Sequence, residues 1–124
     1  MYAVLPNSAP LSAADAEAVE RLLQVCIADF NRMQREELNN RAVPIPAYVD
    51  QKQFFIELPE YKRQYFAFIN SRGEKEVQVN CFCTEVPNWR RQLVVVSDGG
   101  NCFFHVTVNL SNNTWHDMAA NGSA

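Results

Sequence analysis

The sequence has little that would mark it for a membrane, a nucleic acid or export. No run of apolar residues approaches the roughly 20 that a membrane-spanning helix needs. The net charge is −3, so no positive excess attracts a nucleic acid. Residues 1–10 lack the basic and long apolar segments of a signal peptide. We therefore expect no membrane span, no nucleic-acid partner and a cytoplasmic location, or secretion if a signal was removed from the N-terminus.

Catalytic and cofactor motifs are also missing. The sequence has no GxSxG elbow, no HExxH, no P-loop and no dinucleotide fingerprint. Its two histidines are poorly placed for catalysis. Cys102 and His105, three residues apart on a strand, should point to opposite faces, and adjacent His116 and Asp117 should point apart. We predict no catalytic residue and no cofactor.

Four cysteines are the most conspicuous chemistry that is present: Cys26, Cys81, Cys83 and Cys102. All four are expected on faces that point into the core. Two cysteines at CxC spacing on a strand lie roughly 6–7 Å apart, which is a poor chelate for zinc, and no CxxC knuckle is present. We predict no metal site. The main interpretation is buried free thiols, and the alternative is a disulfide of Cys102 with Cys81 or Cys83 in an oxidising compartment.

Residues 13–38 have the pattern of a long amphipathic helix. Ser12 and Asp15 are spaced as a capping box at its start, and Pro44 and Pro46 prevent its continuation. Apolar residues recur every three or four positions; they are Val19, Leu22, Leu23, Cys26, Ile27, Phe30 and Met33. Residues 1–10, bounded by prolines, are expected to be irregular.

Residues 47–119 are predicted to form an antiparallel sheet. Runs of β-forming residues between turn signals predict strands at 53–58, 64–70, 75–83, 91–97, 102–110 and 115–119. A two- or four-residue loop within 71–74 would place Phe66 opposite Val79, and Phe68 opposite Val77. These four side chains would then face the helix.

One helix followed by a meander of four to six strands is an α+β layout for a single domain of residues 1–124. The apolar stripe of the helix is expected to pack on the apolar face of the sheet. The layout resembles cystatin-like proteins, in which a curled antiparallel sheet wraps a helix. Such folds serve inhibitors, binders and enzymes, so the architecture alone does not specify a function.

The C-terminal half also resembles a family of small uncharacterised bacterial proteins. The segments that carry the resemblance are Tyr61–Tyr65, Asn70–Lys75, Val79–Cys83, Trp89, Asp98–Phe104, Asn109–Leu110 and Asn121–Gly122. The resemblance implies no established activity, so no functional residue is carried over. Some of the similar proteins look secreted.

Two surfaces are candidate binding sites. In a meander, one end of the sheet would collect basic and aromatic residues, namely Tyr61, Lys62, Arg63, Trp89, Arg90 and Arg91. Arginines beside aromatic rings suit carboxylates, phosphates or a protein partner. The competing interpretation is a solvated basic rim, neutralised in part by Glu60 and Glu85.

The outer face of the sheet is the second candidate. It is expected to carry Tyr65, Ala67, Ile69, Phe82, Phe103 and His105. Left uncovered, this apolar patch would fit a protein partner or a homodimer; alternatively, other segments of the chain cover it.

The leading hypothesis is a non-enzymatic binding or protein-interaction domain that uses the outer face or the Trp89/Arg90/Arg91 end. The alternative is a small enzyme or ligand pocket between helix and sheet, with Cys81, Cys83 or Cys102 as nucleophile. A fast-reacting thiol of depressed pKa would favour the enzyme. The identity of any small ligand is left open.

Overall fold

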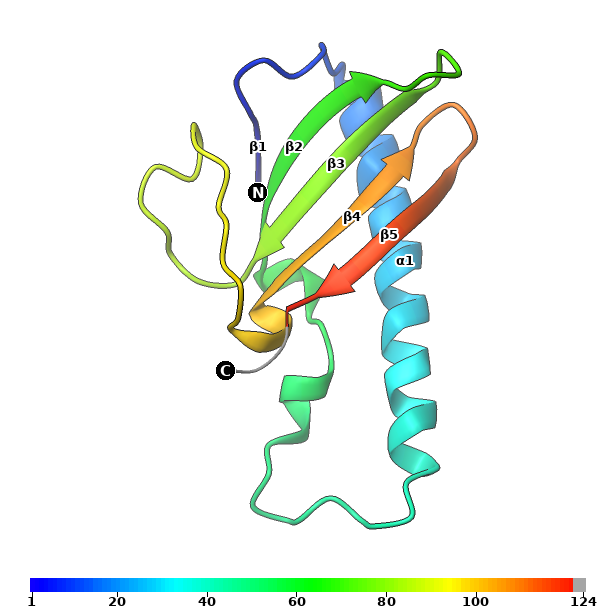
Figure 1. Cartoon of the computed structure of the whole chain (residues 1–124), viewed down its shortest axis with the longest axis vertical. Helices are drawn as coiled ribbons and strands as arrows, with labels where there is room; N and C mark the ends of the chain where they lie inside the picture. The colour runs from blue at the N-terminus through cyan, green and yellow to red at the C-terminus, as the bar shows by residue number, and fades with distance from the viewer. Residues whose placement is uncertain (122–124) are drawn as a thin grey trace.

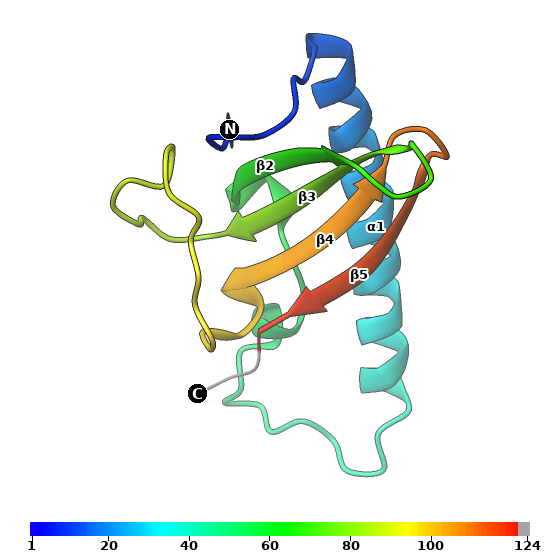
Figure 2. The same ribbon diagram turned by 45° about the horizontal axis from the view of Figure 1, so that its top comes forward.

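A computed structural model describes residues 1–121 as one long helix lying across one face of a five-stranded sheet (Figures 1 and 2). The elements are β1 (Tyr2–Val4), α1 (Ala13–Asn39), β2 (Lys62–Ile69), β3 (Lys75–Phe82), β4 (Phe103–Asn109) and β5 (Thr114–Ala120), with short 3-10 helices η1 (Gln51–Phe54), η2 (Leu58–Glu60) and η3 (Gly100–Cys102). The strands lie in the order β1-β2-β3-β4-β5. All neighbours are antiparallel except β1 and β2, and the sheet is open. The predicted α+β class is confirmed.

Helix α1 begins as the sequence predicts. The N–H of Asp15 donates to Ser12 Oγ at 3.0 Å, and the N–H of Ser12 donates to Asp15 Oδ2 at 3.1 Å, which completes the capping box. The helix buries Ala16, Val19, Leu23, Cys26 and Ile27 against the sheet.

The last turns of α1 extend past the sheet (Figure 1) and contact a different segment. Met33, predicted on the apolar stripe, is 57% exposed there. The side chain of Asn31 bonds both backbone groups of Ile56 at 2.9 Å, and Gln34 donates to the carbonyl of Phe54 at 3.0 Å.

Two predictions for segments that precede β2 in the chain are wrong. The predicted strand 53–58 lies in and between η1 and η2, because Asn31 occupies the backbone groups of Ile56 that a ladder would use, and Pro59 lies within η2. Residues 1–10 are not wholly irregular, since β1 pairs in parallel with β2 and matches Tyr2 with Arg63.

The β2–β3 register differs by one residue from the prediction. Tyr65 pairs with Val79, and Ala67 pairs with Val77. The N–H of Asn70 bonds the carbonyl of Glu74 at 2.9 Å, which leaves a three-residue loop with Gly73 at φ +77°. A loop with an odd number of residues shifts the register by one, and this turns the side chains of one strand to the opposite face of the sheet. Tyr65 and Ala67, expected on the outer face, are therefore buried against the helix, in the same core cluster as their strand partners Val79 and Val77.

A buried arginine ties α1 to β2. Arg63 is only 5% exposed, and its Nη2 lies 2.7 Å from Glu20 Oε1 on the helix. The hydroxyl of Tyr65 donates to the other oxygen of Glu20 at 3.3 Å, and Arg63 also donates to the carbonyl of Tyr61. Glu20 is therefore the anionic partner that makes a charged group tolerable under the helix.

We predict that Glu20→Ala lowers the free energy of unfolding by about 2 kcal/mol, because it leaves the guanidinium of Arg63 buried without its anion. Glu17→Ala, at an exposed position of the same helix, is the matched control and should change stability by less than about 0.5 kcal/mol. Urea unfolding of both variants tests this, and equal midpoints would contradict it.

Candidate functional site

The segment between β3 and β4 folds onto the outer face of the sheet. Phe82, Trp89 and Val94 are buried together in a second apolar cluster, with Phe103 packed against them. The rings of Phe82 and Trp89 meet edge to face, with centroids 5.7 Å apart. The outer face and the Trp89 end, separate candidates in the sequence, therefore form one surface.

Side-chain amides hold this segment in place. Gln64 on β2 is fully buried; its Nε2 donates to the carbonyls of Trp89 and Gln92, each at 2.6 Å, and its Oε1 accepts from the N–H of Val94 at 2.9 Å. Asn80 on β3 donates to the carbonyl of Val94 at 2.8 Å. The strand predicted at 91–97 is therefore wrong: the segment lies beside the sheet without joining its ladder, because side chains satisfy its backbone.

Leu93 and Val95 project from this segment into solvent. They are 59% and 80% exposed, whereas Val94 between them is 8% exposed. A groove of about 380 Å³ runs beside Leu93 and is lined by Leu5, Pro6, Phe66, Gln78, Arg91 and Leu93. A second groove of about 290 Å³ adjoins it and reaches Val95 and His105. The surface thus combines exposed apolar side chains with an apolar hollow.

The basic and aromatic residues predicted at one end of the sheet are divided between its two faces. Tyr61 and Arg63 are buried on the helix side. Lys62 pairs with Glu85 at 2.6 Å. Side chains alternate between the two faces along β2, which causes this separation. The sequence prediction treated the six residues as one group and did not take this alternation into account.

Two arginines of that group remain at the surface. The guanidinium of Arg90 lies 4.7 Å from the ring centroid of Trp89, and Arg91 is exposed beside the groove. Phe82, Phe103 and His105 lie on the outer face as predicted by their alternation, with Phe82 paired to Phe103.

The same segment needs glycine at position 99. Gly99 has φ +98°, and a Cβ there would lie 2.7 Å from the ring of Phe103. A larger residue at position 99 would therefore be strained. The chain leads from Gly99 into η3 and forms no hairpin there.

The cysteines behave in two different ways. Cys26 and Cys81 are free and buried, and burial raises the pKa of the Cys26 thiol to about 11 and also raises that of Cys81. Cys83 and Cys102 form a disulfide outside the core, so the prediction that all four point inward is wrong for this pair. Cys83 lies just past the end of β3, where its side chain no longer follows the inner face.

The cysteine chemistry bears on the enzyme alternative. Raised pKa values keep Cys26 and Cys81 protonated, which is typical of structural thiols. A groove of about 670 Å³ does open beside the disulfide, between the 50–61 region and η3. The hydroxyl of Tyr61, which lines it, donates to the carbonyl of Asn101 at 2.7 Å, and burial raises its pKa to about 12.

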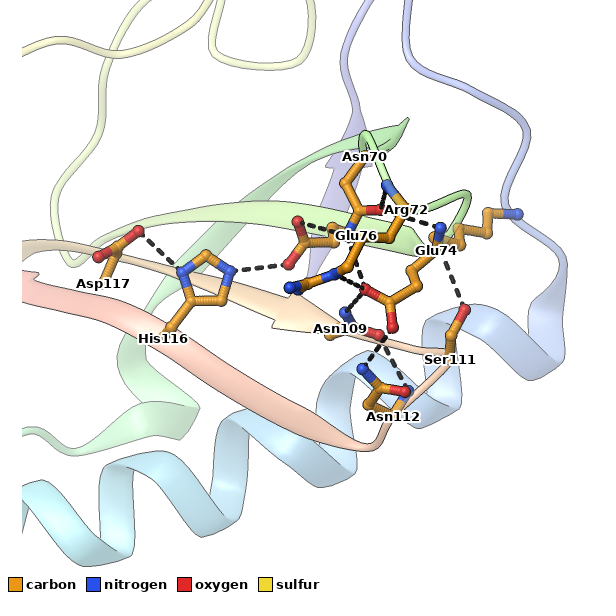
Figure 3. Close-up of polar contacts among 10 residues, drawn as sticks. Asn70, Arg72, Glu74, Glu76, Asn109, Ser111, Asn112, His116 and Asp117 are labelled. Atoms are coloured by element: carbon orange, nitrogen blue, oxygen red, sulfur yellow. Dashed lines mark hydrogen bonds and ion pairs between the residues drawn. The ribbon is translucent and has the colours of Figure 1, made fainter.

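A polar network on the outer face was not predicted (Figure 3). His116 Nε2 lies 2.7 Å from Glu76 Oε2, and its Nδ1 lies 2.8 Å from Asp117 Oδ2. The hydrogen bonds to Glu76 and Asp117 raise the pKa of His116. Carboxylates contact both ring nitrogens, so neither nitrogen is left free to take a proton from another molecule.

A β-bulge brings His116 and Asp117 together. The β4–β5 register shifts between His105 and Thr107, and Asp117 has φ +56°. The expectation that these adjacent residues point apart is therefore wrong. The sequence feature that could have indicated this bulge is the aspartate that follows the histidine on an edge strand, since Asp adopts positive φ more readily than most residues.

Beside this triad, Glu74 closes the β2–β3 turn onto the β4–β5 turn (Figure 3). Its carboxylate accepts from Asn70 at 3.0 Å, Arg72 at 3.0 Å and Asn112 at 2.6 Å, and these hydrogen bonds lower its pKa to about 2. This network joins the two hairpin ends.

Comparisons with known proteins give no further guide. No family model, no curated protein and no solved structure matches this chain. Within residues 1–121, no group of three or more His, Cys, Asp or Glu side chains has an arrangement that could hold a metal ion. The described helices include none with the length and apolar character to cross a membrane.

The disulfide generates one prediction. Reduction, or Cys102→Ser, should lower the free energy of unfolding by about 3 kcal/mol, because the bond closes a loop with a sequence separation of 19. Urea unfolding with and without dithiothreitol measures this. The double variant Cys83→Ser/Cys102→Ser should be insensitive to the reductant, and an equal response in both proteins would contradict the pairing.

His116 generates a second prediction. Its raised folded-state pKa means that its stabilising effect is complete below the unfolded value of 6.5 and is lost as pH rises through the folded value. The stability advantage of the wild type over His116→Gln should therefore shrink between pH 6 and 8, within roughly the range where histidine titrates. In a Glu76→Gln background this pH dependence should be weaker, and an unchanged dependence would rule out Glu76 as its cause.

Proposed function

We propose that this chain is a non-enzymatic interaction domain that binds an extended polypeptide on its outer face. The binding surface is the 92–96 segment, its neighbours Arg90 and Arg91, and the groove lined by Leu5 and Phe66. The observation that carries the proposal is the exposure of Leu93 and Val95, 59% and 80%, on a segment where Val94 is buried and Val96 packs against the same cluster.

Physical chemistry supports a polypeptide as the partner. Exposed apolar side chains next to an apolar hollow favour burial against a partner. Arginine is enriched at protein interfaces, and Arg90 is already ordered by its stacking on Trp89. Buried thiols, together with a histidine whose nitrogens are both occupied, favour binding over the cysteine-nucleophile alternative.

The helix-on-sheet arrangement supports our proposal that the architecture is cystatin-like. The resemblance of residues 61–122 to small bacterial proteins supports a bacterial origin in that uncharacterised family. The Cys83–Cys102 bond would persist in an oxidising compartment, so of the two locations considered we propose the secreted one for the oxidised protein.

The proposed function is tested with a phage-displayed library of random dodecapeptides selected on the wild-type protein. We expect enrichment of peptides with apolar residues at alternate positions, as extended strands present them. Synthetic versions of these peptides should bind Leu93→Asp/Val95→Asp at least about tenfold more weakly.

Tyr48→Asp is the matched control, because Tyr48 is 89% exposed and lies outside the proposed surface. It should bind the selected peptides as the wild type does. Failure of any peptide to be enriched, or equal binding by the Leu93/Val95 variant, would contradict the proposed function.

A further inference from the structure

The outer face of the sheet already holds one segment of chain through side-chain amides. Gln64 and Asn80 bond the backbone of the 92–96 segment, at the carbonyl of Gln92 and at both groups of Val94. An amide side chain can do this because it carries both a donor and an acceptor, as the backbone does. This face therefore binds polypeptide backbone without forming a strand ladder with it.

Gln78 offers the same chemistry to a chain from outside. It lies two residues before Asn80 on β3, so both side chains project from the outer face. Gln78 is exposed and lines both grooves, and among residues 1–121 its amide makes no hydrogen bond. Phe66 lies opposite it on β2, and Leu93 lines the same groove. A peptide in the groove can therefore bond Gln78 through its backbone while it buries an apolar side chain against Phe66 and Leu93.

The charges of this surface favour an acidic partner. The chain has 14 acidic and 11 basic residues, yet among residues 1–121 no aspartate or glutamate lines either groove. Arg91 lines the groove of about 380 Å³, is exposed, and pairs with no carboxylate within the same residues.

Other cations of the same end of the sheet already have an anion. Lys62 pairs with Glu85, and Arg63 pairs with Glu20. Arg91 differs from them because its guanidinium faces the groove without one. A guanidinium can bind a carboxylate through two parallel hydrogen bonds, so Arg91 is suited to an aspartate or glutamate of a partner.

We propose that the occupant of this groove is an extended acidic peptide segment. Arg91 pairs with an aspartate or glutamate side chain of that segment, and Gln78 bonds its backbone beside an apolar residue. This inference rests on the proposed function, because it names the chemical class of the polypeptide that the same surface binds. Arg91 then determines which sequences are preferred, whereas Gln78 contributes to the binding of each of them.

Peptides selected from the dodecapeptide library on the wild type give the first test. Aspartate or glutamate should be enriched close to the apolar positions, and lysine and arginine should be depleted. The selected peptides are synthesised with amidated C-termini, so that no terminal carboxylate can replace the side chain. Changing the enriched acid to its amide, asparagine or glutamine, should weaken binding to the wild type about fivefold, the size expected of an exposed ion pair.

Arg91→Gln tests the same pair from the side of the protein. This variant should bind the acidic peptides about fivefold more weakly than the wild type does, and it should bind the acidic and amide versions equally. Arg21→Gln is the matched control, because it removes the same charge from an exposed position of α1, across the sheet from the groove. It should bind both versions as the wild type does.

Gln78→Met tests the contact with the peptide backbone. Methionine keeps a side chain of similar length but removes both hydrogen-bonding groups of the amide. The acidic and amide versions should therefore both bind this variant about three- to tenfold more weakly than they bind the wild type. Binding as strong as that of the wild type would overturn the role of Gln78.

The inference and the proposed function fail in different ways. If acidic and amide versions bind the wild type equally, if basic peptides are enriched, or if the chain associates with itself and excludes peptides, the acidic partner is overturned. The proposed function still stands if the amide versions lose binding to Leu93→Asp/Val95→Asp, because that loss comes from the apolar contact. Enrichment of no peptide contradicts both.

Discussion

The side-chain amide of Gln64 is the contact on which the outer half of this protein depends. It projects from β2 on the face opposite the helix, is fully buried, and satisfies backbone groups of Trp89, Gln92 and Val94. Removing it would leave those groups without their partners, at a cost of about 1–3 kcal/mol for each one that stays buried. Together with Asn80 and the Cys83–Cys102 bond, this amide holds Trp89 beside Phe82 and leaves Leu93 and Val95 exposed.

The two faces of the sheet therefore carry different chemistry. On the inner face, apolar side chains of the strands and of α1 make a continuous core, interrupted by the ion pair of Arg63 with Glu20. On the outer face, amides and carboxylates attach loops and turns to the strands at Gln64, Asn80 and Glu74. Apolar burial determines the inner layer, and directional hydrogen bonds determine the outer one.

This difference explains what the sequence could predict. Periodicity and turn signals located α1 and the four long strands β2 to β5, because periodicity reports burial of one face. It failed at 91–97, where four consecutive apolar residues predict a strand. The backbone of this segment is instead bonded by the side chains of Gln64 and Asn80, which only the fold brings near. Periodicity also failed to give the β2–β3 register. Both faces of β2 carry apolar residues, so their pattern does not show which face is buried. The three-residue loop supported by Asn70 and Gly73 determines the register instead.

The candidate site was partly predictable for the same reason. Alternation placed Phe82, Phe103 and His105 on one face, but could not show that Trp89 would fold over Phe82. The pairing of His116 with Asp117 depends on a bulge, which has no periodic signal. The cysteine pair lies where a strand ends, so its direction could not be inferred from the strand.

The side-chain anchoring of the 84–99 segment has a consequence for how this protein can change over evolutionary time. Its two ends are joined to each other by the Cys83–Cys102 bond, and its middle is held through backbone atoms, which are the same for any amino acid. Positions 93 and 95 are therefore free of packing constraints from the core. Their identity can vary between lineages while the helix and sheet stay the same, so new recognition can arise without a cost in folding.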